Sequence, residues 1–175
     1  MMPRLQQVIV LAFCYLAFIA AGNATDIEHQ RREAGLPSTT PARLWELAES
    51  QYWQVRQIIA RNRRTPRELL HELAVDRHPQ VRIGVATNLN TDERTFLVLA
   101  EDKDIAVRSV VARFEYVPVA ALQVLARDNA AEVRLEVARN LNANREILAL
   151  LEKDDHPEIS STAQQALHRF MDQKP

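Results

Sequence analysis

The sequence predicts an all-α protein, a short right-handed α-solenoid of about five two-helix repeats of 26 residues. The first observation is a Leu-Ala pair that recurs at Leu47-Ala48, Leu73-Ala74, Leu99-Ala100 and Leu125-Ala126. The second is a Val-Arg pair that recurs at Val55-Arg56, Val81-Arg82, Val107-Arg108 and Val133-Arg134. A fixed period of this length is typical of a solenoid, because one small unit cannot bury its own apolar face and neighbouring units must share a core.

The first helix of each repeat is expected to begin at a capped residue. In the second repeat, Thr65 is the predicted N-cap, Pro66 takes the first helical position and Glu68 completes a capping box. The segment from Thr91 to Arg94 is expected to begin the next repeat in a similar way. The apolar column of this helix consists of Leu44, Leu70, Phe96, Leu122 and Leu148. This column is predicted to face the core.

The second helix of each repeat is expected to follow a turn that contains an aspartate. Pro79 suits the first position of such a helix. Val81 and Val85 are four residues apart and therefore share one face, and every other repeat has an apolar pair in the same places. Asn62, Asn88 and Asn140 stand where the second helix should stop. Because glycine is scarce in this chain, we expect these asparagines to take the left-handed C-terminal position.

The predicted repeat domain spans residues 41–172, and its last unit departs from the pattern. Ile159-Ser160 replaces Val-Arg, and Gln164 replaces the alanine that ends the earlier second helices. A more polar final unit is what a terminal cap of a repeat stack requires.

Residues 1–24 have the layout of a secretory signal peptide. Arg4 supplies the positive start, and an uncharged apolar run from Val8 to Ala21 ends in small residues. Cleavage after Gly22 or Ala24 would give a periplasmic or secreted protein, and the alternative is an uncleaved N-terminal anchor. The only cysteine, Cys14, lies inside this segment, so the mature chain is expected to have no disulfide and no cysteine-held metal.

Residues 25–40 show almost no repeat signal. They are polar and mixed in charge, and a turn sequence runs from Gly35 to Ser38. The sequence therefore predicts a polar tether between the signal peptide and the repeats.

The repeat pattern resembles a known group of proteins. A unit with Leu73-Ala74, Asp76, Val81-Arg82 and Asn88 resembles the bacterial leucine-rich repeat variant and is similar to HEAT-like repeats. The resemblance covers Pro41 to about Arg169 and implies an α-solenoid in which turn aspartates pair with second-helix arginines. It implies no particular function, because such repeats serve many roles. The iron–sulfur segment of the best-known variant-repeat protein needs cysteines that this chain lacks, so a redox role does not transfer.

No catalytic, cofactor-binding or metal-binding residues are predicted. The chain contains neither a glycine-rich phosphate loop nor a His, Cys or carboxylate pattern with ligand spacing. His78 and His156 share a repeat position but lie three repeats apart, which is too far to share an ion. The net charge of −1, from 22 basic and 23 acidic residues, gives no field that would gather nucleic acid.

Two arginine columns are candidate binding features. The column of Arg56, Arg82, Arg108 and Arg134 could bind anions, but we favour a structural role in ion pairs with the turn aspartates. A second column contains Arg61, Arg113 and Arg139, and the aliphatic residues Ile83 and Leu135 are expected on the same outward face. This surface is predicted to bind a protein or peptide, and the alternative is a solvated face with isolated apolar residues.

Phe114 and Tyr116 break the polar pattern of the third repeat. They could anchor a partner, or they could fill a gap beside a turn that Val117-Pro118 distorts. The sequence thus favours an exported, non-catalytic scaffold that binds a protein or peptide. The alternatives are a nucleic-acid-binding HEAT-like protein, which export and charge disfavour, and a regulatory subunit of an envelope enzyme. Contact with a membrane is expected only through an uncleaved N-terminal segment.

Overall fold

The computed structural model describes residues 25–172, and in this range the chain is all-helical with no strand. The first helices of the repeats are α2 (Pro41–Ala48), α4 (Arg67–Leu73), α6 (Glu93–Ala100), α8 (Val119–Leu125) and α10 (Arg145–Leu151). The second helices are α3 (Trp53–Arg61), α5 (Pro79–Ala86), α7 (Ile105–Arg113), α9 (Ala131–Arg139) and α11 (Pro157–Asp172). The predicted signal peptide, residues 1–24, lies outside the described residues.

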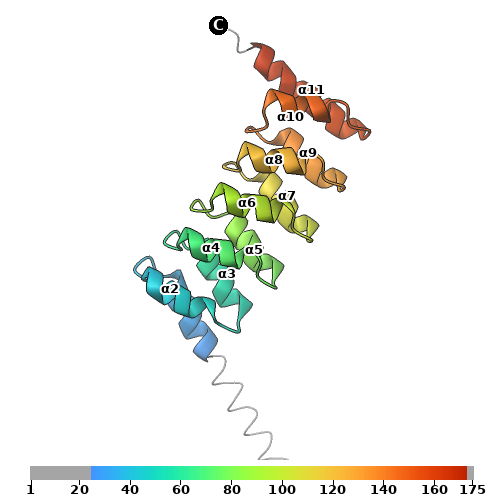
Figure 1. Ribbon diagram of the computed structural model, residues 1–175. Coiled ribbons are helices and arrows are strands. Elements are labelled where there is room, and N and C mark those ends of the chain that lie inside the picture. The colour runs from blue at the N-terminus through green and yellow to red at the C-terminus, as the bar shows by residue number, and fades with distance from the viewer. Residues whose placement is uncertain (1–24, 173–175) are drawn as a thin grey trace, which may run out of the picture.

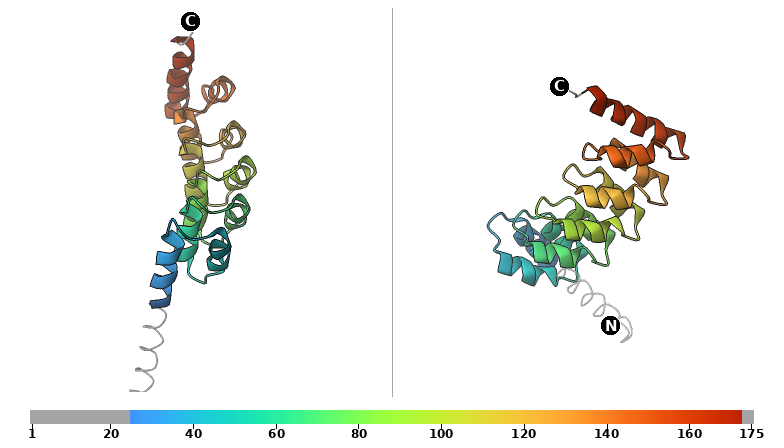
Figure 2. Two further views of the ribbon diagram at one scale, coloured as in Figure 1. Left: turned by 90° about the vertical axis from the view of Figure 1, so that its left-hand side faces the viewer. Right: turned by 45° about the horizontal axis from the view of Figure 1, so that its top comes forward.

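The helix pairs follow one another along a single axis (Figure 1). The first helices form one layer and the second helices form the other, as the view in the left panel of Figure 2 shows. The turns that lead from a second helix to the next first helix lie together at one edge of the stack, on the left in Figure 1. The turns that contain the aspartates lie at the opposite edge.

The core lies between the two layers and consists of the predicted aliphatic columns. The first helices contribute Leu44, Leu70, Phe96, Leu122 and Leu148, all of them buried. The second helices contribute Val55, Val81, Val107, Val133 and Ile159, each with no exposed surface. Full burial of a Leu or Val side chain is worth roughly 1.5–3 kcal/mol. Because the buried columns continue from repeat to repeat, neighbouring repeats share this stabilising core.

The predicted tether is wrong over residues 25–35, which form a helix in line with the layer of second helices (Figure 2). Ala34 is completely buried, and Ile27 packs against the core. The side-chain amide of Asn62 donates a hydrogen bond to the carbonyl of Ala34 at 2.7 Å, just as Asn88 donates to Ala60 at 2.7 Å one repeat later. Residues 25–35 therefore take the place of a second helix that precedes the first full repeat.

The prediction of an N-cap at Thr65 is also wrong. The helix begins after Pro66, which takes the N-cap position without a side-chain hydrogen bond. The Thr65 hydroxyl instead donates to the carbonyl of Ile59 at 2.6 Å and so satisfies the end of the preceding helix. One repeat later, Asp92 is the N-cap and accepts a hydrogen bond from the amide of Thr95 at 2.9 Å.

The asparagines that follow the second helices do not adopt the left-handed conformation. Among the described residues no non-glycine residue has a positive φ, and Asn62 has φ −71° and ψ 127°. The hydrogen bonds of their side chains explain why asparagine stands at these positions. Asn88 donates to the carbonyls of Ala60 and Asn62, at 2.7 and 3.0 Å, in the preceding repeat. These hydrogen bonds, which we call the asparagine ladder, tie consecutive repeats together.

Candidate functional site

The arginine column at Arg56, Arg82, Arg108 and Arg134 forms ion pairs with the aspartates of the next turn, as favoured from the sequence. In the second repeat, the Nε and Nη2 atoms of Arg82 bind the two carboxylate oxygens of Asp102 at 2.5 and 2.8 Å. Its Nη1 atom donates to the backbone carbonyl of Asp76 at 2.7 Å. In each of these four pairs, which we call the Arg–Asp ladder, the Nε and Nη2 atoms of the arginine bind both carboxylate oxygens. The ladder therefore stabilises the stack and leaves little of each guanidinium for an external anion.

The ion pairs lower the pKa of three ladder aspartates, Asp76, Asp128 and Asp154. Burial by itself would raise the pKa of Asp76, but hydrogen bonds from Arg56 and from the backbone amide of His78 outweigh it, so the pKa is lower than usual. The same balance lowers the pKa of Asp128. At the more exposed end of the ladder, the hydrogen bond from Arg134 is the main cause of the lowered pKa of Asp154.

The asparagine ladder is interrupted at the third repeat. Phe114 and Tyr116 replace the two asparagines that stand in this turn one repeat earlier, Asn88 and Asn90. The Phe114 ring packs on Phe96 with centroids 5.9 Å apart and contacts the edge of Tyr116 at 5.8 Å. Phe114 is half-buried, so its role is packing, whereas 62% of Tyr116 is exposed and available to a partner.

The arginines of the second column differ in whether they form ion pairs. Arg61 and Arg113 are exposed at the ends of α3 and α7, and neither forms an ion pair within the described residues. Arg139 is exposed as well, but its guanidinium binds Glu158 at 2.9 Å and lies 3.7 Å from Glu136. Two of the three predicted arginines are therefore open to a partner.

The two predicted aliphatic residues contribute less than expected. Ile83 on α5 and Leu135 on α9 are half-buried and pack against the core. They lie on the layer of second helices, but they do not form an exposed apolar strip. Their burial follows from the close spacing of successive second helices.

Sequence reasoning missed two exposed leucines. Leu89 is 57% exposed and Leu141 is 77% exposed, and both stand between the asparagines of their turns. The signal was present, because the 26-residue register places both at one repeat position and predicts a turn there. We define the turn edge as residues 61–64, 87–90, 113–116 and 139–142, which lie on the left in Figure 1. It combines these leucines with Tyr116 and the free arginines.

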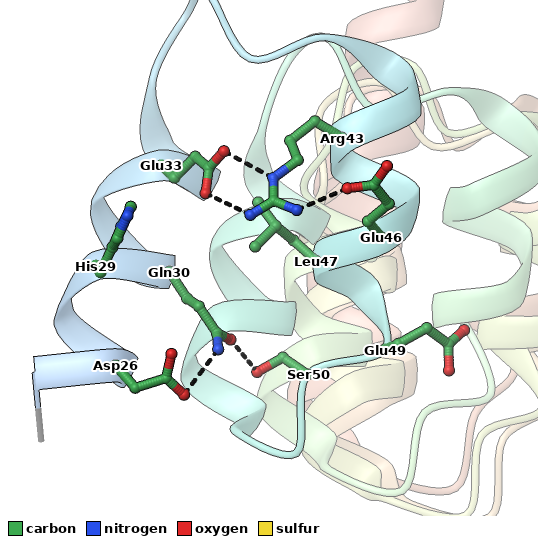
Figure 3. A pocket seen from close by; sticks show the side chains of 9 residues that line it. All are labelled: Asp26, His29, Gln30, Glu33, Arg43, Glu46, Leu47, Glu49 and Ser50. Atoms are coloured by element: carbon green, nitrogen blue, oxygen red, sulfur yellow. Dashed lines mark hydrogen bonds and ion pairs between the residues drawn. The ribbon is translucent and has the colours of Figure 1, made fainter. Parts of the chain in front are cut away.

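A cavity of about 390 Å³ lies at the N-terminal end of the stack, between the helix at residues 25–35 and α2 (Figure 3). Its wall contains Asp26, Glu33, Glu46 and Glu49, with Leu47 beneath them. Arg43 binds Glu33 at 2.7 and 2.9 Å and Glu46 at 2.6 Å, and the hydrogen bond from Arg43 lowers the pKa of Glu33. The polar groups of this cavity thus largely satisfy one another.

The described residues contain no group of three or more His, Cys, Asp or Glu side chains that could hold a metal ion. Across residues 25–172 no helix combines the length and the apolar character needed to cross a bilayer. Comparison of the chain with family models, with curated proteins and with solved structures finds no match.

Proposed function

We propose that this chain is a periplasmic or secreted, non-catalytic scaffold, a right-handed α-solenoid of 26-residue repeats that binds a protein or peptide. The turn edge is the proposed binding surface. The observation that supports it is that Arg61 and Arg113 form no ion pair within the described residues and occur on the same edge as the exposed side chain of Tyr116. Exposed arginine and tyrosine side chains are the residue types most enriched at protein interfaces.

The arrangement of the repeats favours binding over catalysis. Stacked two-helix units present an extended surface, on which each unit contributes one turn. The charged groups of the Arg–Asp ladder are taken up by contacts within the stack. On the turn edge, by contrast, arginines that form no ion pair within the described residues lie in the same turns as exposed large apolar side chains.

Charge also distinguishes the turn edge from the aspartate edge. The turn edge contains five arginines, Arg61, Arg63, Arg64, Arg113 and Arg139, and one acidic residue, Glu115. The matching stretches of the aspartate edge, residues 75–78, 101–104, 127–130 and 153–156, contain seven acidic and four basic residues. Four of the acidic residues are paired with ladder arginines, which leaves three acidic and four basic residues there. A partner that docks on the turn edge is therefore expected to be acidic.

The test is capture of partners from an envelope fraction with the full chain as bait. The variant Arg61→Glu/Arg113→Glu reverses two charges on the turn edge, and Arg77→Glu/Arg127→Glu makes the same change on the aspartate edge. We expect the first variant to lose its partners and the second to keep them. Equal capture by both variants would show that the turn edge is not the binding surface. An alkaline-phosphatase fusion tests export separately, and an inactive fusion would contradict a periplasmic or secreted location.

A further inference from the structure

The turn edge presents one large apolar side chain on each of three consecutive turns. These are Leu89, Tyr116 and Leu141, with 57%, 62% and 77% of their surface exposed. Leu89 and Leu141 share one repeat position, and Tyr116 stands one residue after that position, which Glu115 holds in its turn. The asparagine ladder holds the outer two turns in place. Asn90 donates to the carbonyl of Arg63 at 2.6 Å, and Asn142 donates to the carbonyl of Glu115 at 2.5 Å. The leucines beside these asparagines are therefore exposed on ordered backbone, which lowers the entropic cost of binding.

The spacing of these turns matches an extended polypeptide. Neighbouring packed helices lie about 8–10 Å apart, so successive turns are separated by about the same distance. A polyproline II chain rises about 3.1 Å per residue with three residues per turn, and its side chains therefore return to one face about every 9 Å. A chain in this conformation would place every third side chain over a successive turn of the stack.

The charges of the turn edge indicate which residues should lie between the apolar residues of a bound extended chain. Arg63 and Arg113 flank Leu89 along the stack, and both are exposed without an ion pair in the part of the chain that the structure describes. Carboxylates between the apolar residues of the partner could reach these guanidinium groups. Nucleic acid fits less well, because two of the three exposed apolar side chains are aliphatic and offer no stacking surface to a base.

We propose that the turn edge binds an extended acidic segment of another polypeptide, with an apolar residue at every third position that contacts Leu89, Tyr116 and Leu141 in turn. This inference rests on the proposed function and specifies its partner. It requires no movement of the stack, since the contact side chains are already exposed.

The probe is a short fluorescein-labelled peptide with a leucine at every third position and acidic residues between. Its control is a peptide of the same composition with the leucines grouped together. Binding to the full chain is measured by fluorescence anisotropy at low ionic strength. We expect the spaced peptide to bind at least about tenfold more tightly than the grouped peptide.

Variants of the chain identify the surface. Leu89→Ser/Leu141→Ser should weaken binding of the spaced peptide by about tenfold or more, because it removes two of the three apolar contacts. Val75→Ser removes a side chain that is 71% exposed at the aspartate edge and should leave binding unchanged. Circular dichroism checks that all variants are folded. Equal binding of the two peptides, or equal effects of the two variants, would overturn the inference.

Two further outcomes separate this inference from the proposed function. Single-stranded DNA that displaces the spaced peptide more effectively than the unlabelled peptide would overturn the inference in favour of nucleic acid. If the spaced peptide fails to bind while capture still depends on Arg61 and Arg113, only the extended-peptide inference is overturned. If peptide binding and arginine-dependent capture are both absent, the proposed function is overturned with it.

Discussion

The Ser50 hydroxyl donates a hydrogen bond to the side-chain carbonyl of Gln30 at 2.6 Å, at the place that an arginine–aspartate pair takes in the four ladder steps that follow. Gln30 precedes Arg56 by one repeat length, and Ser50 precedes Asp76 by the same number of residues. The Gln30 amide also donates to Asp26 at 3.0 Å (Figure 3). A neutral pair thus begins the Arg–Asp ladder, at the end of the stack that borders the acidic cavity.

Gln30→Arg/Ser50→Asp should extend the ladder by one ion pair. We expect the double variant to be more stable than the sum of the two single variants by about 1–3 kcal/mol, because each introduced charge satisfies the other. Urea denaturation of the four proteins in the double-mutant cycle measures this coupling. Strictly additive single effects would show that residues 25–35 do not share the geometry of the later second helices.

Arg82→Ala should destabilise the fold by about 3–5 kcal/mol, because it leaves the carboxylate of Asp102 buried without a counter-charge. The side chains of Arg82 and Asp102 are each only 5% exposed. Arg134→Ala should cost less, since the Arg134 side chain is 20% exposed and water can replace part of its contact. The midpoints of urea denaturation give this order.

Arg77→Ala is the matched control for both ladder variants. Arg77 is exposed and donates to the backbone carbonyl of Gln51 at 3.2 Å. A surface change of this kind should alter stability by less than about 0.5 kcal/mol. If Arg82→Ala has no larger effect than the control, the ladder does not stabilise the stack.

The repeat register predicted the parts of the fold that depend on periodic packing. Val81 and Val85 show why: the space between the two helical layers is filled mainly by apolar side chains, so the spacing of apolar residues in the sequence reveals the buried face. The repeat register did not predict structure where other polar residues take the places of the repeated arginine and aspartate. Gln30 and Ser50 stand at the arginine and aspartate positions of the repeat but are different residue types. The sequence pattern therefore did not reveal the helix at residues 25–35.

The binding surface was only partly predictable for a different reason. Arg139 is not free, because Glu158 of the next repeat binds it. Glu132 stands in the same register relation to Arg113, yet no ion pair joins these two within the described residues. Whether Ile83 is exposed depends on how closely α3 and α5 approach. The register assigns a residue to a face, but the exposed fraction of its side chain depends on the neighbouring repeat.

Asn88→Ala should destabilise the fold by about 1–3 kcal/mol, because it leaves the buried carbonyl of Ala60 without its side-chain donor and removes a second hydrogen bond to the half-buried Asn62. Asn88 is itself only 4% exposed, so water cannot readily take its place. Urea denaturation measures the loss. Asn129→Ala, at an exposed position in the turn after α8, is the control and should change stability by less than about 0.5 kcal/mol. Equal effects at both positions would argue against a stabilising asparagine ladder.

Gly84→Ala should destabilise the fold even though alanine favours a helix by about 1 kcal/mol over glycine. A Cβ atom at position 84 would lie 2.8 Å from the Cβ of Ala60, and the backbone of α3 would have to shift. Overpacking of this kind typically costs about 1–3 kcal/mol. Thermal denaturation of Gly84→Ala and of Ala60→Gly/Gly84→Ala checks the cause. The double variant removes the Cβ atom of residue 60 and with it the clash. It should therefore be more stable than Gly84→Ala, even though it carries a new helical glycine at position 60.

Acid should destabilise the stack through its paired carboxyl groups. The pKa values of Asp76, Asp128 and Asp154 are lower than usual in the folded chain, so the unfolded chain binds protons more readily than the folded chain as the pH falls. The stability that these groups provide is fully present well above the unfolded pKa, about 3.9 for aspartate, and is lost as the pH falls through the lower folded values.

We therefore expect the free energy of unfolding that these aspartates contribute to stay level from about pH 7 to pH 5 and to fall below about pH 4. Urea denaturation at a series of pH values measures the curve. Asp154→Asn should be less stable than the native chain at neutral pH and should lose less stability on acidification, because it can no longer bind a proton at that position. Parallel curves for the two proteins would show that the Arg134–Asp154 pair does not contribute to the acid sensitivity of the stack.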